Sequence, residues 1–109
     1  MIFITGPLYS GKRTFASGLP GRQLAGAEKL AAQTRTDAEL TALADRLAAE
    51  YDIVLATEVG GGVVPIDPDE RRAREAAGRL ACLLAARAEC VVQMFCGIPT
   101  ILKGELPSC

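Results

Sequence analysis

The chain has 109 residues, half of them apolar and 23% charged, with a formal net charge of −1. This length predicts one domain over residues 1–109, and the lack of a basic excess argues against nucleic acid as a partner. No apolar run reaches the roughly 18–20 residues that span a bilayer, and no basic segment typical of a signal peptide precedes the first apolar run, so we expect no membrane contact and a cytoplasmic location.

The first predicted element is a strand, and two helices follow it. Residues 2–5 form a short apolar run that ends at Gly6, which is typical of a buried strand in a parallel sheet. Residues 12–17 are expected to begin a helix, which glycine and proline interrupt just beyond residue 17. Residues 23–33 are rich in alanine and weakly amphipathic, and they predict a second helix.

The middle of the chain predicts a longer helix and a second strand. Thr36 and Glu39 form a capping box, in which a hydroxyl and a carboxylate satisfy free backbone amides at the start of a helix. Leucine and alanine then recur at helical spacing, so this helix is expected to end near Glu50. Residues 52–57 are the second apolar run and predict a strand that ends at Glu58.

The last third predicts the longest helix and a third strand. Asp67 suits the N-cap of this helix and Pro68 suits its first position. Residues 90–96 predict the third strand, and residues 101–109 are expected to be irregular. The alternation of strands and helices predicts an α/β fold with a small three-stranded parallel sheet and flanking helices.

The cysteines do not form a metal-binding pattern. None of the four belongs to a C-x-x-C pair, and the chain has no histidine, which argues against a zinc site. Cys82, Cys90 and Cys96 lie in apolar stretches and are predicted to be buried, reduced thiols.

The segment between the first strand and the first helix matches a phosphate-binding loop (P-loop). It is Gly6-Pro7-Leu8-Tyr9-Ser10-Gly11-Lys12-Arg13-Thr14, which fits G-x-x-x-x-G-K. In such a loop, backbone amides surround the β-phosphate and the lysine neutralises the outer phosphates. We therefore predict that residues 6–14 bind phosphate and that Lys12 takes part in catalysis. The alternative is a glycine-rich turn with an incidental lysine.

Arg13 stands where this kind of loop has the serine or threonine that ligates Mg²⁺. A guanidinium has only donors and cannot ligate a metal. Thr14 has a hydroxyl, but one further residue turns it by about 100° around a helix. We expect phosphate binding to survive this change and the placement of Mg²⁺ to suffer.

Three motifs in the second half of the chain resemble one family. The first, after the second strand, is Glu58-Val59-Gly60-Gly61-Gly62-Val63-Val64-Pro65. The second, on the last helix, is Arg71-Arg72-Ala73-Arg74-Glu75-Ala76-Ala77-Gly78-Arg79-Leu80, and the third is Gly97-Ile98-Pro99 followed by Leu102-Lys103. With the P-loop, they resemble the adenosylcobinamide kinase/adenosylcobinamide-phosphate guanylyltransferase (CobU) family of cobalamin biosynthesis, over Met1–Ala16 and about Asp52–Lys103.

The resemblance implies a P-loop NTPase-like fold, GTP or ATP as the nucleotide, and the corrinoid adenosylcobinamide as the phosphoryl acceptor. It also implies guanylyl transfer through a histidine, an activity expected to be lost because this chain has no histidine. Family members are longer, and the segment of their second and third strands is reduced here to Gly18–Tyr51. The acidic residue of that segment, which helps hold the metal, has no evident counterpart, and Thr57 replaces an asparagine of the family.

The resemblance also implies roles for residues near the carboxyl edge of the sheet. Glu58 is predicted to be a base or a metal contact, with an ordinary turn carboxylate as the alternative. Gly60, Gly61 and Gly62 are predicted to contact substrate. Most arginines of the last helix form a solvated face, and Arg79 is the one predicted to reach phosphate.

The shortened segment has a consequence for assembly. The first, fourth and fifth strands are adjacent in the family's sheet, so the three remaining strands stay contiguous and residues 52–57 become an edge. An exposed apolar edge favours pairing, so we expect a homo-oligomer, with the helix over residues 36–50 as the alternative cover.

Two functions fit the sequence. The first is a shortened cobinamide kinase-like transferase that uses GTP or ATP. The alternative is a catalytically inactive relative that binds nucleotide or a protein partner. Arg13 and the missing histidine favour this alternative, whereas the P-loop and the family motifs favour the first.

Overall fold

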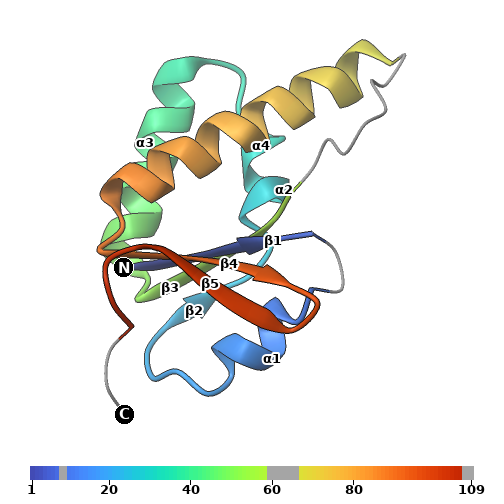
Figure 1. Ribbon diagram of the computed structural model, residues 1–109. Helices are drawn as coiled ribbons and strands as arrows, with labels where there is room; N and C mark the ends of the chain where they lie inside the picture. Colours follow the sequence, from blue (N-terminus) through green and yellow to red (C-terminus); the bar gives the residue numbers. More distant parts are fainter. Residues whose placement is uncertain (8–9, 59–66, 107–109) are drawn as a thin grey trace.

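The structure, a computed structural model, describes residues 1–7, 10–58 and 67–106. These residues form an α/β fold around a sheet in the order β2-β3-β1-β4-β5 (Figure 1). The strands are β1 (Ile2–Gly6), β2 (Gln23–Leu24), β3 (Ile53–Thr57), β4 (Cys90–Phe95) and β5 (Ile98–Lys103). The helices are α1 (Lys12–Ala16), α2 (Ala27–Ala31), α3 (Asp37–Glu50) and α4 (Pro68–Arg87).

The three predicted strands form the parallel centre of the sheet. β1 lies between β3 and β4 and pairs with both in parallel, so that Ile4 lies beside Leu55 and Val92. All three of these side chains are at most 3% exposed. A strand covered on both faces has a continuous apolar sequence, which explains why these strands were predictable.

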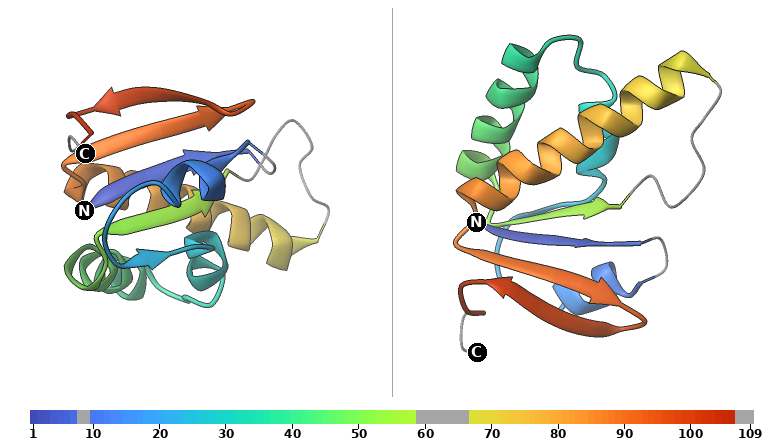
Figure 2. Two further views of the ribbon diagram at one scale, coloured as in Figure 1. Left: turned by 90° about the horizontal axis from the view of Figure 1, so that it is seen from below. Right: turned by 45° about the horizontal axis from the view of Figure 1, so that its top comes forward.

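Helices cover the two faces of the sheet unequally. α3 and α4 lie side by side with α2 on one face, and the short α1 lies on the other (Figures 1 and 2). Phe3 and Val54 point into the core beneath the long helices, where Leu80 and Leu84 of α4 pack. The opposite face packs against α1 and the residues after it. The P-loop starts where β1 ends, beside the carboxyl ends of the parallel strands β3 and β4.

The prediction of three strands was wrong, because β2 and β5 extend the sheet on both sides. β2 pairs in parallel with Ile53 and Val54 on the outer side of β3, so only the second half of β3 lacks a strand on that side. Residues 23–33 were predicted to be one helix, but Asp52 holds the chain at Arg22 in an extended path, with Arg22 N–H donating to Asp52 Oδ2 at 2.8 Å. The helix α2 starts only at Ala27.

The predicted irregular tail was wrong for residues 101–103, which belong to β5. Cys96 and Gly97 both adopt positive φ angles, 51° and 77°, and they turn the chain back so that β5 pairs antiparallel with β4. Gly97 ends the third strand as one residue of a two-residue hairpin turn, and the chain continues beyond it as a further strand. Two of the predicted buried thiols are also exposed, Cys82 and Cys96, whereas Cys90 is buried and its burial raises its pKa.

The predicted helix caps are confirmed. Thr36 Oγ1 accepts a hydrogen bond from the Glu39 N–H at 3.1 Å, and the Glu39 carboxylate accepts one from the Arg35 N–H at 2.7 Å. Asp67 accepts from the Asp69 N–H at 3.0 Å, directly before Pro68. Within the described ranges, no helix is long and apolar enough to cross a bilayer.

Candidate functional site

The P-loop has the predicted setting between a strand and a helix. β1 ends at Gly6, and α1 starts at Lys12 directly after Gly11, whose φ is 92°. A Cβ on Gly6 would lie 2.5 Å from the Met94 carbonyl oxygen, so only glycine fits there. Leu8 and Tyr9 lie outside the described residues.

The turn between β4 and β5 supports the P-loop from the side. Gly97 N–H donates to the Ser10 carbonyl at 2.9 Å, and a Cβ on Gly11 would lie 3.2 Å from the Gly97 Cα. Ser10 itself is buried, with 2% of its surface exposed. The glycine of the third family motif therefore holds the P-loop in place.

Lys12 lies across the P-loop. Its side chain is only 8% exposed, and its Nζ donates to the Pro7 carbonyl at 2.8 Å and to Ser10 Oγ at 3.4 Å. Burial lowers the pKa of Lys12, while the nearby Glu28 and Glu58 carboxylates act in the opposite direction. A cation is thus held over the loop where an anion would bind, with two carboxylates close enough to affect its titration.

Glu58 lies at the same edge of the sheet, directly after β3. Its N–H donates to the Gly6 carbonyl at 2.9 Å, and its Oε1 accepts from Gln93 Nε2 at 2.8 Å. Because β3 and β4 flank β1, this side-chain bond bridges the two neighbours of the strand that leads into the P-loop. The structure therefore brings Glu58 and Lys12 to one edge.

Glu28 is a further charged residue of this site, and no sequence signal predicted it. Its Oε1 accepts from the Thr57 N–H at 3.1 Å, whereas its Oε2 is buried and receives no hydrogen bond from the described residues. It borders a small hollow of about 130 Å³, which we call the Lys12 hollow. The lining of the Lys12 hollow consists of Lys12, Arg13, Ala25, Gly26, Glu28, Lys29, Leu55 and Thr57.

No motif marked Glu28 in the sequence. Its position depends on β2, because it follows the end of that strand by only four residues. A two-residue strand leaves no periodic pattern that would identify this end. The last two residues of the P-loop differ in position. Arg13 lines the Lys12 hollow, whereas Thr14 is exposed and does not line it.

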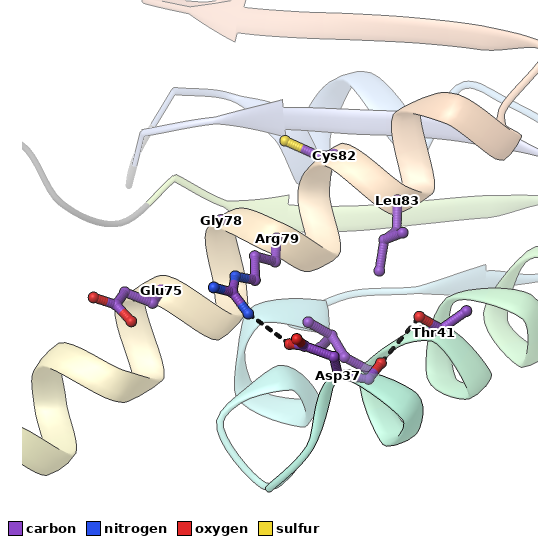
Figure 3. A pocket seen from close by; sticks show the side chains of 8 residues that line it. Asp37, Thr41, Glu75, Gly78, Arg79, Cys82 and Leu83 are labelled. Carbon is purple, nitrogen blue, oxygen red and sulfur yellow. Dashed lines mark hydrogen bonds and ion pairs between the residues drawn. The ribbon is translucent and has the colours of Figure 1, made fainter.

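Arg79 lies at a different hollow, of about 690 Å³, between α3 and α4 (Figure 3). Its guanidinium Nη1 donates to Asp37 Oδ1 at 2.5 Å, and both side chains are largely exposed. None of the residues that line this hollow lines the Lys12 hollow, so the structure does not bring Arg79 to Lys12. Gly60, Gly61 and Gly62, the other predicted substrate contacts, lie outside the described residues.

Comparison with known proteins assigns a family. The family model for cobinamide kinase / cobinamide phosphate guanyltransferase (CobU) matches residues 23–102 of the 109-residue chain. A search of the curated proteins finds no match. The match starts after the P-loop, so the P-loop geometry and the family assignment are separate observations. The chain belongs to the CobU family of cobinamide kinase / cobinamide phosphate guanyltransferase proteins, which gives it a role in cobalamin biosynthesis with nucleotide binding.

Proposed function

We propose that this chain is a shortened cobinamide kinase that transfers a phosphoryl group from GTP or ATP to adenosylcobinamide. The observation that supports this proposal best is the position of Lys12, a nearly buried cation held over a P-loop at the edge where Glu58 also lies. Ligands of open α/β sheets bind at the carboxyl ends of the strands, which is where these residues lie.

The residues suggest a division of roles. Backbone N–H groups of the P-loop bind the nucleotide phosphates, and Lys12 neutralises the charge on the outer phosphates. Glu58 accepts the proton of the acceptor hydroxyl as that oxygen bonds to the γ-phosphorus, and the nucleoside diphosphate leaves. Gln93, which donates to Glu58 at 2.8 Å, orients this carboxylate.

Guanylyl transfer is proposed to be lost. In the family this step passes through a histidine, and the full sequence contains none. Gly60, Gly61 and Gly62 are proposed to contact the substrate. The contact of Arg79 with phosphate is also proposed, and in the structure its guanidinium is paired with Asp37.

The alternative is a relative that binds nucleotide or a partner protein without turnover. Arg13 supports it, because the side chain at the usual Mg²⁺-ligand position has only donors. The two proposals differ in whether product forms.

A product assay separates the kinase from the relative that binds without turnover. Purified protein, incubated with Mg²⁺, adenosylcobinamide and either GTP or ATP, is expected to yield adenosylcobinamide phosphate and the nucleoside diphosphate, detected by mass spectrometry. Glu58→Gln is expected to slow the reaction by about 10²–10⁴-fold, because it removes the base and keeps an acceptor oxygen near Gln93. Glu50→Gln, at the exposed end of α3, is the matched control. A nucleotide-bound protein that forms no product contradicts the kinase and favours the alternative.

Self-association is also proposed, although the edge that first suggested it is covered in part by β2. Phe95 and Ile98 pair directly across β4 and β5 and therefore share one face of the sheet, where both are 65% exposed, and we propose that they pack against a second copy of the chain in the cytoplasm. Pro99 has no N–H, so contact through side chains is favoured over extension of the sheet. Light scattering at micromolar concentration is expected to show an oligomer that Ile98→Asp dissociates and Ala42→Asp, at an exposed position of α3, does not. A wild-type monomer contradicts this proposal.

A further inference from the structure

Glu28 has a carboxylate oxygen that the fold leaves unsatisfied. The atom Oε2 is buried and receives no hydrogen bond from the described residues, whereas Oε1 accepts from the Thr57 N–H. A buried acceptor without a partner costs about 1–3 kcal/mol, and more when it is charged, so such an atom calls for an explanation.

The short length of β2 explains why Glu28 Oε1 has a hydrogen-bond partner. β2 pairs with β3 only beside Ile53 and Val54, so the N–H of Thr57, further along β3, has no strand on that side. Glu28 replaces the missing strand partner. This bond fixes the carboxylate at the end of β3, and Oε2 is the atom that remains for another ligand.

The surroundings of Glu28 are those of a phosphate site. It shares the Lys12 hollow with the cations Lys12, Arg13 and Lys29, and it is the only acidic residue among the lining residues. Three cations around one carboxylate favour an anionic ligand such as phosphate, and they favour a metal ion only together with that anion. At about 130 Å³ the Lys12 hollow has room for a hydrated ion. Mg²⁺ in nucleotide sites is held by one or two carboxylates together with substrate phosphates, and a single well-placed carboxylate meets that need.

A preformed metal site without phosphate is not present in the described ranges, where no group of three or more His, Cys, Asp or Glu residues could hold a metal ion. The donor set therefore fits a cation that arrives with the nucleotide. Arg13 removes the usual hydroxyl ligand from the P-loop, and Glu28 approaches the same loop from α2.

We propose that Glu28 Oε2 is a ligand of the divalent cation that accompanies the nucleotide phosphates, an inference that rests on the proposed nucleotide binding. α2 then supplies the acidic residue that has no evident counterpart in the sequence of the shortened segment. Glu28 makes the affinity for nucleotide depend on Mg²⁺, because without the cation the carboxylate repels the phosphates.

The test compares nucleotide dissociation constants with Mg²⁺ and with a chelator, by calorimetry with ATP and GTP, for wild type and Glu28→Gln. Glutamine keeps an oxygen for the Thr57 N–H but loses the charge, and a thermal melt checks that the fold is kept. Chelation is expected to weaken wild-type binding about tenfold and binding to Glu28→Gln less than about twofold. Glu50→Gln is expected to behave as wild type. As a second measurement, paramagnetic resonance with Mn²⁺ and nucleotide is expected to show tighter Mn²⁺ binding to the nucleotide complex of wild type than to that of Glu28→Gln.

Three results would overturn the inference, and they are distinguishable. If Glu28→Gln keeps the wild-type response to Mg²⁺, nucleotide binding stands and Glu28 is not a cation ligand. If wild-type affinity is the same with and without Mg²⁺, no cation takes part in binding at this site. If wild type binds no nucleotide in either condition, the proposed function fails and the inference fails with it.

Discussion

Replacing Lys12 by alanine is expected to weaken nucleotide binding by about 10- to 100-fold, because a hydrogen bond from a charged group is worth about 1.5–3 kcal/mol. The Lys12 Nζ lies over the P-loop, within 2.8 Å of the Pro7 carbonyl, so it faces the region where phosphate would bind. Displacement of a fluorescent nucleotide analogue measures the change.

Two further variants test whether the loss of affinity comes from the charge of Lys12 itself. Arg46→Ala removes one positive charge from the exposed side of α3 and is expected to leave affinity unchanged. Lys12→Met keeps most of the buried alkyl chain, which separates the loss of charge from the loss of packing. If Lys12→Met binds nucleotide as tightly as wild type, the P-loop does not work through this lysine.

Replacing Gly6 by alanine is expected to destabilise the fold by about 2–4 kcal/mol and to abolish nucleotide binding. The new Cβ would lie 2.5 Å from the Met94 carbonyl oxygen and 2.7 Å from Ser10 Oγ. Because the carbonyl belongs to the backbone of β4, it can move only if β1 and β4 separate. Denaturant unfolding measures the loss as a lower midpoint.

Gly78 provides the matched control for Gly6. It lies inside α4, and a Cβ there would meet nothing within 4 Å. Gly78→Ala is therefore expected to stabilise the protein by about 0.5–1 kcal/mol, since alanine favours the helix. Equal stability of the Gly6 and Gly78 variants would contradict the close packing of β1, β4 and the P-loop.

The sequence predicted the elements that have strong local signals. Three strands are buried on both faces and thus have continuous apolar runs, and the helices α3 and α4 begin at the capping residues Thr36 and Asp67. The P-loop was visible because its chemistry requires glycines and a lysine at fixed spacing.

The remaining elements depend on contacts between distant parts of the chain. β2 has two residues and exists because Asp52 and β3 hold it, which no local pattern reveals. β5 is exposed along its whole length and is defined by its pairing with β4 after a tight turn at Cys96 and Gly97. Neither strand alternates clearly between apolar and polar residues.

Glu28 was missed for the same reason. Its link to the site is a hydrogen bond to Thr57, 29 positions away, and this bond forms only because β2 ends before it reaches that point. Arg79, in contrast, was singled out by its motif, and the structure places it beside Asp37 rather than beside the P-loop. Motif spacing identifies residue types, whereas the sheet order decides which of them meet.

We infer that the P-loop is a working nucleotide site, and calorimetric titration of the wild-type chain with GTP and with ATP, each with Mg²⁺, tests this claim. We expect binding of one nucleotide per chain at micromolar strength for at least one of the two. The absence of binding by both nucleotides would contradict the claim and would leave the P-loop as a structural turn.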